Sequence, residues 1–209
     1  MTTFQHPPVS TVLGRLFKAA AADTVPSEFP ADATAQEAAD VLADVYMPIS
    51  AQGGDLLYSL VRAIRPSTVV EFGTSYGIST LYLASAVADN GSGHVFTTEL
   101  SAVKIAAARS NVDEALLGDQ VTILAGDALE TLADVPGPIG LVLLDGWKQL
   151  CLPVLRLLEP KLAPGALVVA DDIDLPDLGD YLDYVRNPAN GYVSVAFPVA
   201  DGMEISCRA

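Results

Sequence analysis

Five short apolar runs constrain the fold of this chain most strongly. Valine, leucine and isoleucine tend to follow one another in these runs instead of alternating with polar residues, which indicates strands buried on both faces. Helix-length segments separate the runs, so the strands are expected to lie parallel and to be joined by crossovers. The pattern predicts an α/β fold, a Rossmann-like doubly wound sheet covered by helices. The predicted strands are Thr68 to Phe72, His94 to Thr98, Val121 to Ala125, Gly140 to Leu144 and Ala166 to Ala170.

The two ends of the chain depart from this repeating pattern. Two β-rich runs, Tyr192 to Val199 and Met203 to Arg208, flank Ala200-Asp201-Gly202, which predicts an antiparallel hairpin at one edge of the sheet. The first third of the chain reads as helical, with Thr34 and Glu37 at the spacing of a capping box. Helices are predicted at Val9 to Ala22, Thr34 to Met47 and about Ala51 to Ile64, with a loop from Thr24 to Pro30.

Length and charge narrow the classes of protein. A chain of 209 residues with 51% hydrophobic residues is long enough for one sizeable core, so we expect a single domain with a helical cap over 1–48 and a core over 49–209. The formal charge of -15 disfavours a nucleic-acid partner. No apolar run approaches the roughly 20 residues of a membrane span, and a cytoplasmic location is expected. Cys151 and Cys207 have no ligand spacing and are assigned no role.

Acidic residues stand at the carboxyl end of every predicted parallel strand. Ligands of open α/β sheets bind outside the carboxyl ends of the strands, so these side chains are expected to surround one site. The other interpretation is that individual carboxylates cap the helices that follow. The residues are Glu71, Glu99, Asp127, Asp145, Asp171 and Asp172.

The segment from Glu71 to Gly77 turns from the first strand into a helix. Its glycines permit a positive φ and a close approach of ligand to backbone. The carboxylate before the turn and the missing third glycine disfavour a pyrophosphate and favour a cationic or zwitterionic ligand. Glu99 ends the second strand, where a carboxylate typically accepts hydrogen bonds from ribose hydroxyls. The two features together indicate a nucleoside with a charged substituent.

Six segments carry a resemblance to a known family. They are VVEFGTSYGIST (69 to 80), VFTTEL (95 to 100), VTILAGDALETL (121 to 132), LVLLDGWKQ (141 to 149), ALVVADDID (166 to 174) and VADGMEI (199 to 205). From Met47 to the C-terminus the chain resembles the class I S-adenosylmethionine-dependent methyltransferases. Within them it is similar to the metal-dependent catechol and caffeoyl-CoA O-methyltransferases, because DGWK is followed by DD at the next strand end.

The resemblance implies a set of donor-binding residues. Gly73, Ser75 and Ser79 would hold the methionine part, with Glu71 shaping the turn and Glu99 binding the ribose. Met47 and Trp147 would lie against the donor, although ordinary core packing is the alternative for both. The full implied set is Met47, Ile49, Glu71, Gly73, Ser75, Ser79, Glu99, Asp127, Ala128, Asp145 and Trp147.

Three carboxylates and one lysine indicate a metal site and a general base. Asp145, Asp171 and Asp172 come from adjacent strand ends and cannot share a pocket in ionised form without a cation or a strong pKa displacement. Magnesium accepts such oxygen ligands and leaves positions for substrate oxygens, and manganese or calcium is the alternative. The family's third ligand is often asparagine, whereas this chain has Asp172. Lys148 stands three residues after Asp145 and could act as the general base, the alternative being a solvated helix lysine.

The acceptor is less constrained. In the catechol enzymes a carboxylate on the penultimate strand meets the second substrate hydroxyl, and the corresponding position here is Val195. By resemblance we expect a small phenolic or catechol-like hydroxyl acceptor, with N-terminal helices that cover its site and contribute to a homodimer. The rival interpretations are a nicotinamide-dependent oxidoreductase and a non-catalytic S-adenosylmethionine-binding protein.

Overall fold

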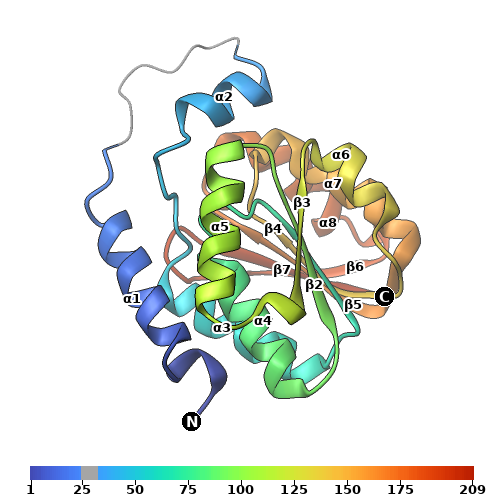
Figure 1. The fold of residues 1–209 in the computed structure, drawn as a ribbon. Coiled ribbons are helices and arrows are strands. Elements are labelled where there is room, and N and C mark those ends of the chain that lie inside the picture. Colours follow the sequence, from blue (N-terminus) through green and yellow to red (C-terminus); the bar gives the residue numbers. More distant parts are fainter. Residues whose placement is uncertain (25–32) are drawn as a thin grey trace.

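Seven strands form a single twisted sheet (Figure 1). The computed structural model describes residues 1–24 and 33–209. The strand order is β3-β2-β1-β4-β5-β7-β6, with β7 antiparallel to both of its neighbours and the other pairs parallel. The predicted doubly wound α/β fold with an antiparallel edge is confirmed. The strands are β1 (Thr68–Phe72), β2 (His94–Glu99), β3 (Val121–Ala125), β4 (Ile139–Leu144), β5 (Leu162–Asp171), β6 (Tyr192–Phe197) and β7 (Met203–Arg208).

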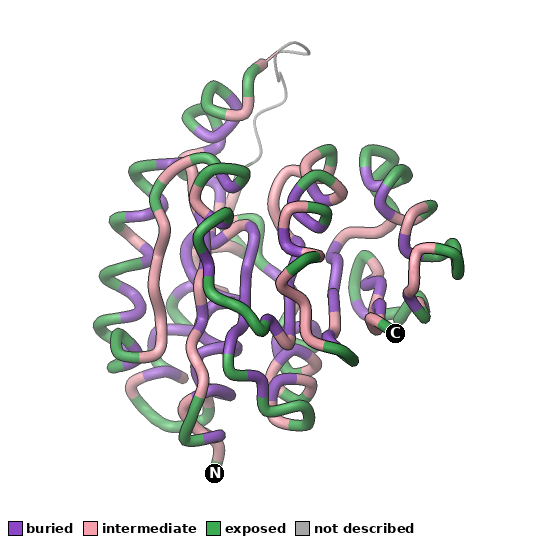
Figure 2. The backbone as a smooth tube through the Cα atoms, turned by 90° about the vertical axis from the view of Figure 1, so that its right-hand side faces the viewer, coloured by how far each residue is buried: buried purple, intermediate pink, exposed green. Residues whose placement is uncertain are grey.

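Helices cover both faces of the sheet. One face packs against α1, α3, α4 and α5, and the other against α6, α7 and α8 (Figure 1). Buried backbone is concentrated in the central strands that these two layers enclose (Figure 2). The helices are α1 (Val9–Ala20), α2 (Ala35–Val41), α3 (Ala51–Ile64), α4 (Ile78–Asn90), α5 (Ala102–Glu114), α6 (Ala128–Thr131), α7 (Cys151–Leu158) and α8 (Gly179–Arg186).

Alternate residues of each central strand belong to different cores. Val69 and Leu141 pack on the side of α4, whereas Val70 and Val142 pack on the side of α7. All four side chains are fully buried. Full burial of a side chain of this size is worth about 1.5 to 3 kcal/mol, so replacing it with a polar residue would be costly on either face. The continuous apolar runs of the sequence follow from this two-sided burial.

The helices before β1 match the prediction only in part. The α3 bounds are as predicted, and the capping box is present, because Thr34 N–H donates to Glu37 Oε2 (2.9 Å) and Glu37 N–H to Thr34 Oγ1 (3.2 Å). The second helix, however, ends at Val41 and not at Met47, whose φ of +44° is incompatible with a helix. The first ends at Ala20, two residues early. The predicted loop, except for Thr24, lies outside the described residues.

Tertiary contacts explain the early end of α2. The Tyr46 ring stacks on Tyr76, with 3.9 Å between ring centroids, and the Tyr46 carbonyl accepts a hydrogen bond from Ser75 Oγ (2.7 Å). Tyr76 Oη donates to the Ala43 carbonyl (2.9 Å). These bonds hold the chain between α2 and α3 across the glycine turn, in a conformation that the helical periodicity does not reveal.

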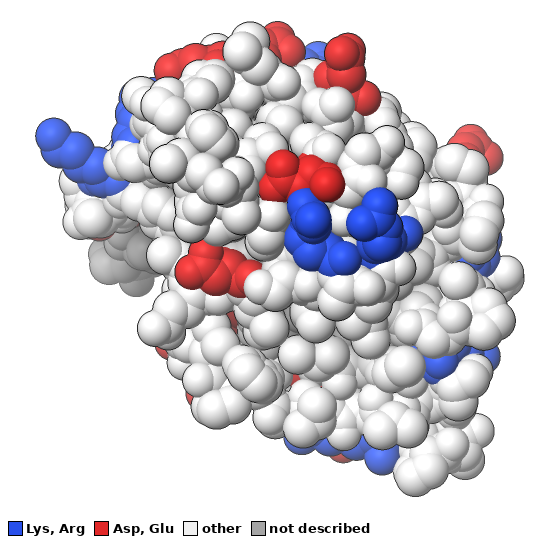
Figure 3. Space-filling view, turned by 90° about the horizontal axis from the view of Figure 1, so that it is seen from below, with Lys and Arg blue, Asp and Glu red and all other residues white. Residues whose placement is uncertain are grey.

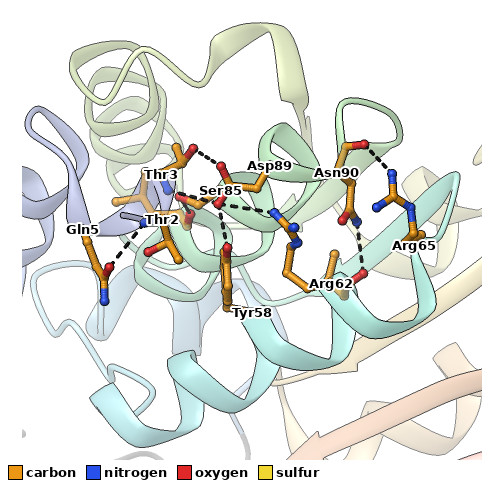
Figure 4. Close-up of polar contacts among 11 residues, drawn as sticks. Thr2, Thr3, Gln5, Tyr58, Arg62, Arg65, Ser85, Asp89 and Asn90 are labelled. Carbon is orange, nitrogen blue, oxygen red and sulfur yellow. Dashed lines mark hydrogen bonds and ion pairs between the residues drawn. The ribbon is translucent and has the colours of Figure 1, made fainter.

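Asp89 anchors the N-terminus to the helical layer (Figure 4). Its carboxylate accepts hydrogen bonds from Thr3 N–H (3.0 Å), Thr3 Oγ1 (2.5 Å) and Tyr58 Oη (2.6 Å), and Arg62 lies 3.6 Å away. Burial opposes ionisation, but these donors and Arg62 prevail and lower the pKa of Asp89. The network therefore joins the first residues of the chain to α3 and α4.

The acidic excess is not uniform over the surface. The face remote from α2, seen from below, carries Lys and Arg side chains interspersed with Asp and Glu (Figure 3). In residues 1–24 and 33–209, no helix has the length and apolar character needed to cross a membrane. The expectations that nucleic acid is not a partner and that the protein is cytoplasmic stay predictions.

Candidate active site

A cavity of about 530 Å³ opens at the carboxyl ends of the parallel strands. Its walls come from the turn after β1, the ends of β2, β4 and β5, and the segment from α2 to α3. All the predicted site residues except Glu71 line it. They are Met47, Ile49, Gly73, Ser75, Ser79, Glu99, Asp127, Ala128, Asp145, Trp147, Lys148, Asp171 and Asp172.

The turn after β1 requires glycine at Gly73. The residue has a φ of +101°, and a Cβ there would lie 2.6 Å from the Asp145 carbonyl oxygen, which real Cβ atoms essentially never do. The turn is fixed by hydrogen bonds from the backbone N–H groups of Gly73 and Thr74 to the Thr98 carbonyl (3.3 and 3.1 Å). Strands β1, β2 and β4 thus meet at the turn, and the backbone faces the cavity without a side chain in the way.

Glu99 is held in place by the backbone around it. Its Oε2 accepts a hydrogen bond from Ser75 N–H, and its Oε1 accepts from the N–H groups of Leu100 and Ser101, each at 2.8 Å. A carboxylate offers about four acceptor sites, so Oε2 retains acceptor capacity toward the cavity. The arrangement fits the predicted interaction with ligand hydroxyls.

Asp145, Asp171 and Asp172 converge in the cavity wall. One carboxylate oxygen from each lies within 4.8 Å of the others. Burial raises the pKa of Asp171 to about 7, with a further rise from Asp145 and Asp172, and burial raises the pKa of Asp145 to about 6. Asp172 has a φ of +57°, a conformation that aspartate and asparagine tolerate better than most residues. The crowding fits a hard cation, because such ions take oxygen ligands.

Lys148 contributes the positive charge at this cluster. It begins a 3-10 turn, Lys148–Leu150, and its Nζ lies 3.2 Å from Asp145 Oδ1 and 3.0 Å from Asp172 Oδ2. Burial disfavours the ammonium, but the two carboxylates outweigh burial and raise the pKa of Lys148. The predicted proximity to Asp145 is confirmed. In this geometry Lys148 is an ammonium ion that offsets part of the carboxylate charge.

Comparison with known proteins bears on what this site does. A family model described as a methyltransferase domain matches residues 70–173. The catechol O-methyltransferase of Mycobacterium tuberculosis is 32% identical over 151 residues, which cover 72% of this chain and 68% of that protein. The catechol O-methyltransferase of Sus scrofa is 30% identical over 147 residues, covering 67% and 78%.

The chain belongs to the S-adenosylmethionine-dependent O-methyltransferases. The fold agrees with this assignment: the crystal structure of the O-methyltransferase from Bacillus cereus in complex with SAH superposes with a TM-score of 0.73 at 22% identity, over 97% of this chain and 93% of that one. Membership of this family argues against the oxidoreductase and against a protein without catalytic activity.

One predicted donor residue of this O-methyltransferase lies outside the cavity. Glu71 is fully buried and does not line the cavity, so its contact with the donor stays a prediction. It accepts a hydrogen bond from Thr80 Oγ1 (2.5 Å) of α4. Burial raises the pKa of Glu71 to about 7. Side chains alternate along a strand, so Glu71 lies on the same face of the sheet as Val69. Helices cover that face, and the Glu71 side chain is directed into this layer and not toward the cavity. The contact to Thr80 is consistent with a part in shaping the turn.

Several cavity residues were not predicted from the sequence. Four residues that line the cavity of this O-methyltransferase were given no role in the site by the sequence analysis: Lys104, Leu175, Asp177 and Asp201. Asp201 lies in the hairpin signal and in the segment VADGMEI, but neither assigned it a place in the site. Val195, in contrast, is 59% exposed on β6 and does not line the cavity. The position where the resemblance leads one to expect a carboxylate is thus a valine outside the cavity.

Proposed function

We propose that this protein transfers the methyl group of S-adenosylmethionine to a hydroxyl of a small phenolic or catechol-like acceptor, with a divalent metal ion at Asp145, Asp171 and Asp172. The observation that carries the proposal is the convergence of these carboxylates within 4.8 Å in the same cavity as Glu99 and Gly73. A nucleoside site and an oxygen-rich cation site then share one chamber, which is the arrangement that metal-assisted methyl transfer to a hydroxyl would need.

The donor would bind along the glycine turn. The ribose hydroxyls would donate to Glu99, and the methionine part would lie over the exposed backbone at Gly73, near Ser75 and Ser79. Asp127 and Ala128 would border the adenine. Asp127 also caps α6 by accepting a hydrogen bond from Leu129 N–H (2.7 Å), which fixes that wall of the site. These contacts orient the donor, and positioning accounts for much of the rate in a displacement of this kind.

The acceptor hydroxyl would lie beside Lys148. A divalent ion held by the three carboxylates would supply positive charge next to that hydroxyl and lower the cost of its deprotonation. Lys148 Nζ touches two of the proposed ligands, at 3.0 and 3.2 Å, so it lies within reach of an oxygen bound there. A divalent ion on these carboxylates would disfavour the ammonium, and Lys148, as a neutral amine, would then receive the hydroxyl proton. Magnesium is the first candidate for the ion, because the donor set is entirely oxygen.

The acceptor class is inferred from the relatives and from the lining. Catechol O-methyltransferases are among the relatives of this chain. Met47, Trp147 and Leu175 line the cavity and offer apolar surface to an aromatic ring, whereas Val195 leaves the second hydroxyl without the carboxylate partner of the catechol enzymes. Catechols and other phenols are therefore both candidate acceptors.

A transfer assay with methyl-labelled S-adenosylmethionine tests the proposal. Catechol, a monophenol and an aliphatic alcohol would be compared with magnesium present, and the product would be identified by mass. We expect label on the phenolic oxygen of at least one aromatic acceptor and none on the alcohol. Methylation of only nitrogen or carbon nucleophiles in a broader panel would contradict the proposed reaction.

A further inference from the structure

Lys104 is a buried lysine in the wall of the cavity. It is 4% exposed and lines the cavity, and among the described residues it has no hydrogen-bond or ion-pair partner for its ammonium. Burial lowers its pKa, and Glu99 and Asp23 only partly offset this effect. Burying a charge without a protein partner is costly, so a lysine of this kind in a cavity wall is a candidate for contact with a ligand.

The position of Lys104 directs it toward the nucleoside end. It lies in the first turn of α5, where its backbone N–H donates to the capping Ser101 Oγ (3.4 Å). Helical side chains tilt toward the helix N-terminus, and the N-terminus of α5 follows directly from Glu99 at the end of β2. Lys104 and Glu99 therefore share one region of the cavity wall.

The two side chains offer complementary groups. Glu99 accepts hydrogen bonds, and Lys104 can donate three but accept none. A ribose has two neighbouring hydroxyls, each of which donates one hydrogen bond and accepts others. Glu99 can take the hydroxyl protons while Lys104 donates to an oxygen lone pair, so this pair recognises a vicinal diol better than either residue alone.

We infer that Lys104 is a ribose-binding residue that acts together with Glu99 in recognising the donor's diol. The inference rests on the proposed placement of the donor at Glu99. It adds a donor-binding residue outside the six segments that carry the family resemblance, because Lys104 lies five residues beyond Glu99 and after the segment VFTTEL.

Calorimetry with two ligands tests this role. The ligands are S-adenosylhomocysteine and its 2′,3′-dideoxy analogue, which lacks the diol. We expect Lys104→Met to bind S-adenosylhomocysteine about 10- to 100-fold more weakly, as for loss of a hydrogen bond from a charged group. Binding of the dideoxy analogue should change little, so the preference for the diol should largely disappear. Lys104→Gln, which keeps a donor, should retain part of the preference.

Arg109→Met is the matched control, because Arg109 is an exposed cation on the same helix. It should bind both ligands as the parent does. An unchanged preference for the diol in folded Lys104→Met or Lys104→Gln would overturn the role of Lys104, and an equal loss for both ligands would assign it to the packing of the cavity wall. A parent protein that binds neither ligand would instead contradict the proposed donor site.

Discussion

Glu71→Gln should become more stable relative to the parent protein as the pH rises from acid to neutral. The side chain is fully buried, and burial raises its pKa from the ordinary 4.5 to about 7. Thr80 donates to Oε2, and Oε1 has no partner among the described residues. A carboxylate in this position is held in its neutral form until the pH is near 7, which glutamine mimics without ionising.

The magnitude follows from proton linkage. Below pH 4.5 Glu71 is protonated in both the folded and the unfolded chain, and it has no effect on the pH dependence. Between 4.5 and about 7 only the unfolded chain releases the proton, so the free energy of unfolding falls as the pH rises. At about 1.4 kcal/mol per pH unit, the total loss in the parent is roughly 3 kcal/mol, and Glu71→Gln does not suffer it.

Thermal and urea unfolding at pH 4.5, 6 and 8 would measure the effect. Between pH 4.5 and pH 8 the free energy of unfolding of Glu71→Gln should rise by roughly 3 kcal/mol relative to that of the parent. For a chain of this size this corresponds to roughly 6 to 12 °C in Tm. The amide of Glu71→Gln has no hydrogen-bond partner at the position of Oε1, and the resulting loss of stability is the same at every pH. The test therefore rests on how the stability difference changes with pH. Affinity for S-adenosylhomocysteine should stay close to the parent's, because Glu71 does not line the cavity.

Glu204→Gln is the control with the opposite sign. Burial opposes ionisation of Glu204, but hydrogen bonds from Arg186 and Ser194 prevail and lower its pKa. The stability that Glu204 contributes is present above its ordinary pKa and lost in acid, so this variant should fall behind the parent as the pH rises. A stability difference for Glu71→Gln that stays constant from pH 4.5 to 8 would refute the reasoning about Glu71.

Two further variants test the donor site and the base. Glu99→Ala should weaken binding of S-adenosylhomocysteine by about 1.5 to 3 kcal/mol, because it removes charged acceptors for the ribose hydroxyls; calorimetry showing parental affinity would overturn that placement. Lys148→Met should leave this affinity near normal and lower kcat by roughly 10²-fold or more, because the hydroxyl proton loses its acceptor; steady-state turnover near the parent's would mean that Lys148 is not the base.

The sequence predicted the sheet well because burial on both faces leaves a direct pattern. The bounds of β1 and β3 agree with the structure to the residue. β5 begins at Leu162, four residues before the prediction, because Pro164 and Gly165 interrupt the apolar run although the strand continues through them. The local composition there indicates a turn, and the pairing with β4 is in fact irregular: Leu162 pairs with Ile139, and the register shifts before Leu167 pairs with Leu141.

The cavity was predicted less evenly, for reasons that are also physical. Residues at strand ends, such as Asp145 and Asp171, could be found because parallel strands deliver their carboxyl ends to one edge. Glu71, one residue before the end of β1, is instead fully buried and outside the cavity lining, so its contact with the donor stays a prediction. Lys104 enters the site only through the packing of α5 against the end of β2, and Met47 does so through the stacking of Tyr46 on Tyr76, neither of which a local pattern encodes.

Metal dependence of methyl transfer tests the central claim most directly. Labelled transfer to catechol would be measured in metal-free protein, with excess EDTA and after magnesium is restored, for the parent and for Asp171→Ala. We predict that chelation abolishes transfer and that magnesium restores it in the parent alone. Binding of S-adenosylhomocysteine should mostly survive in every sample, since most of its predicted contacts come from other strand ends. Full transfer by metal-free parent protein in excess EDTA would contradict the account.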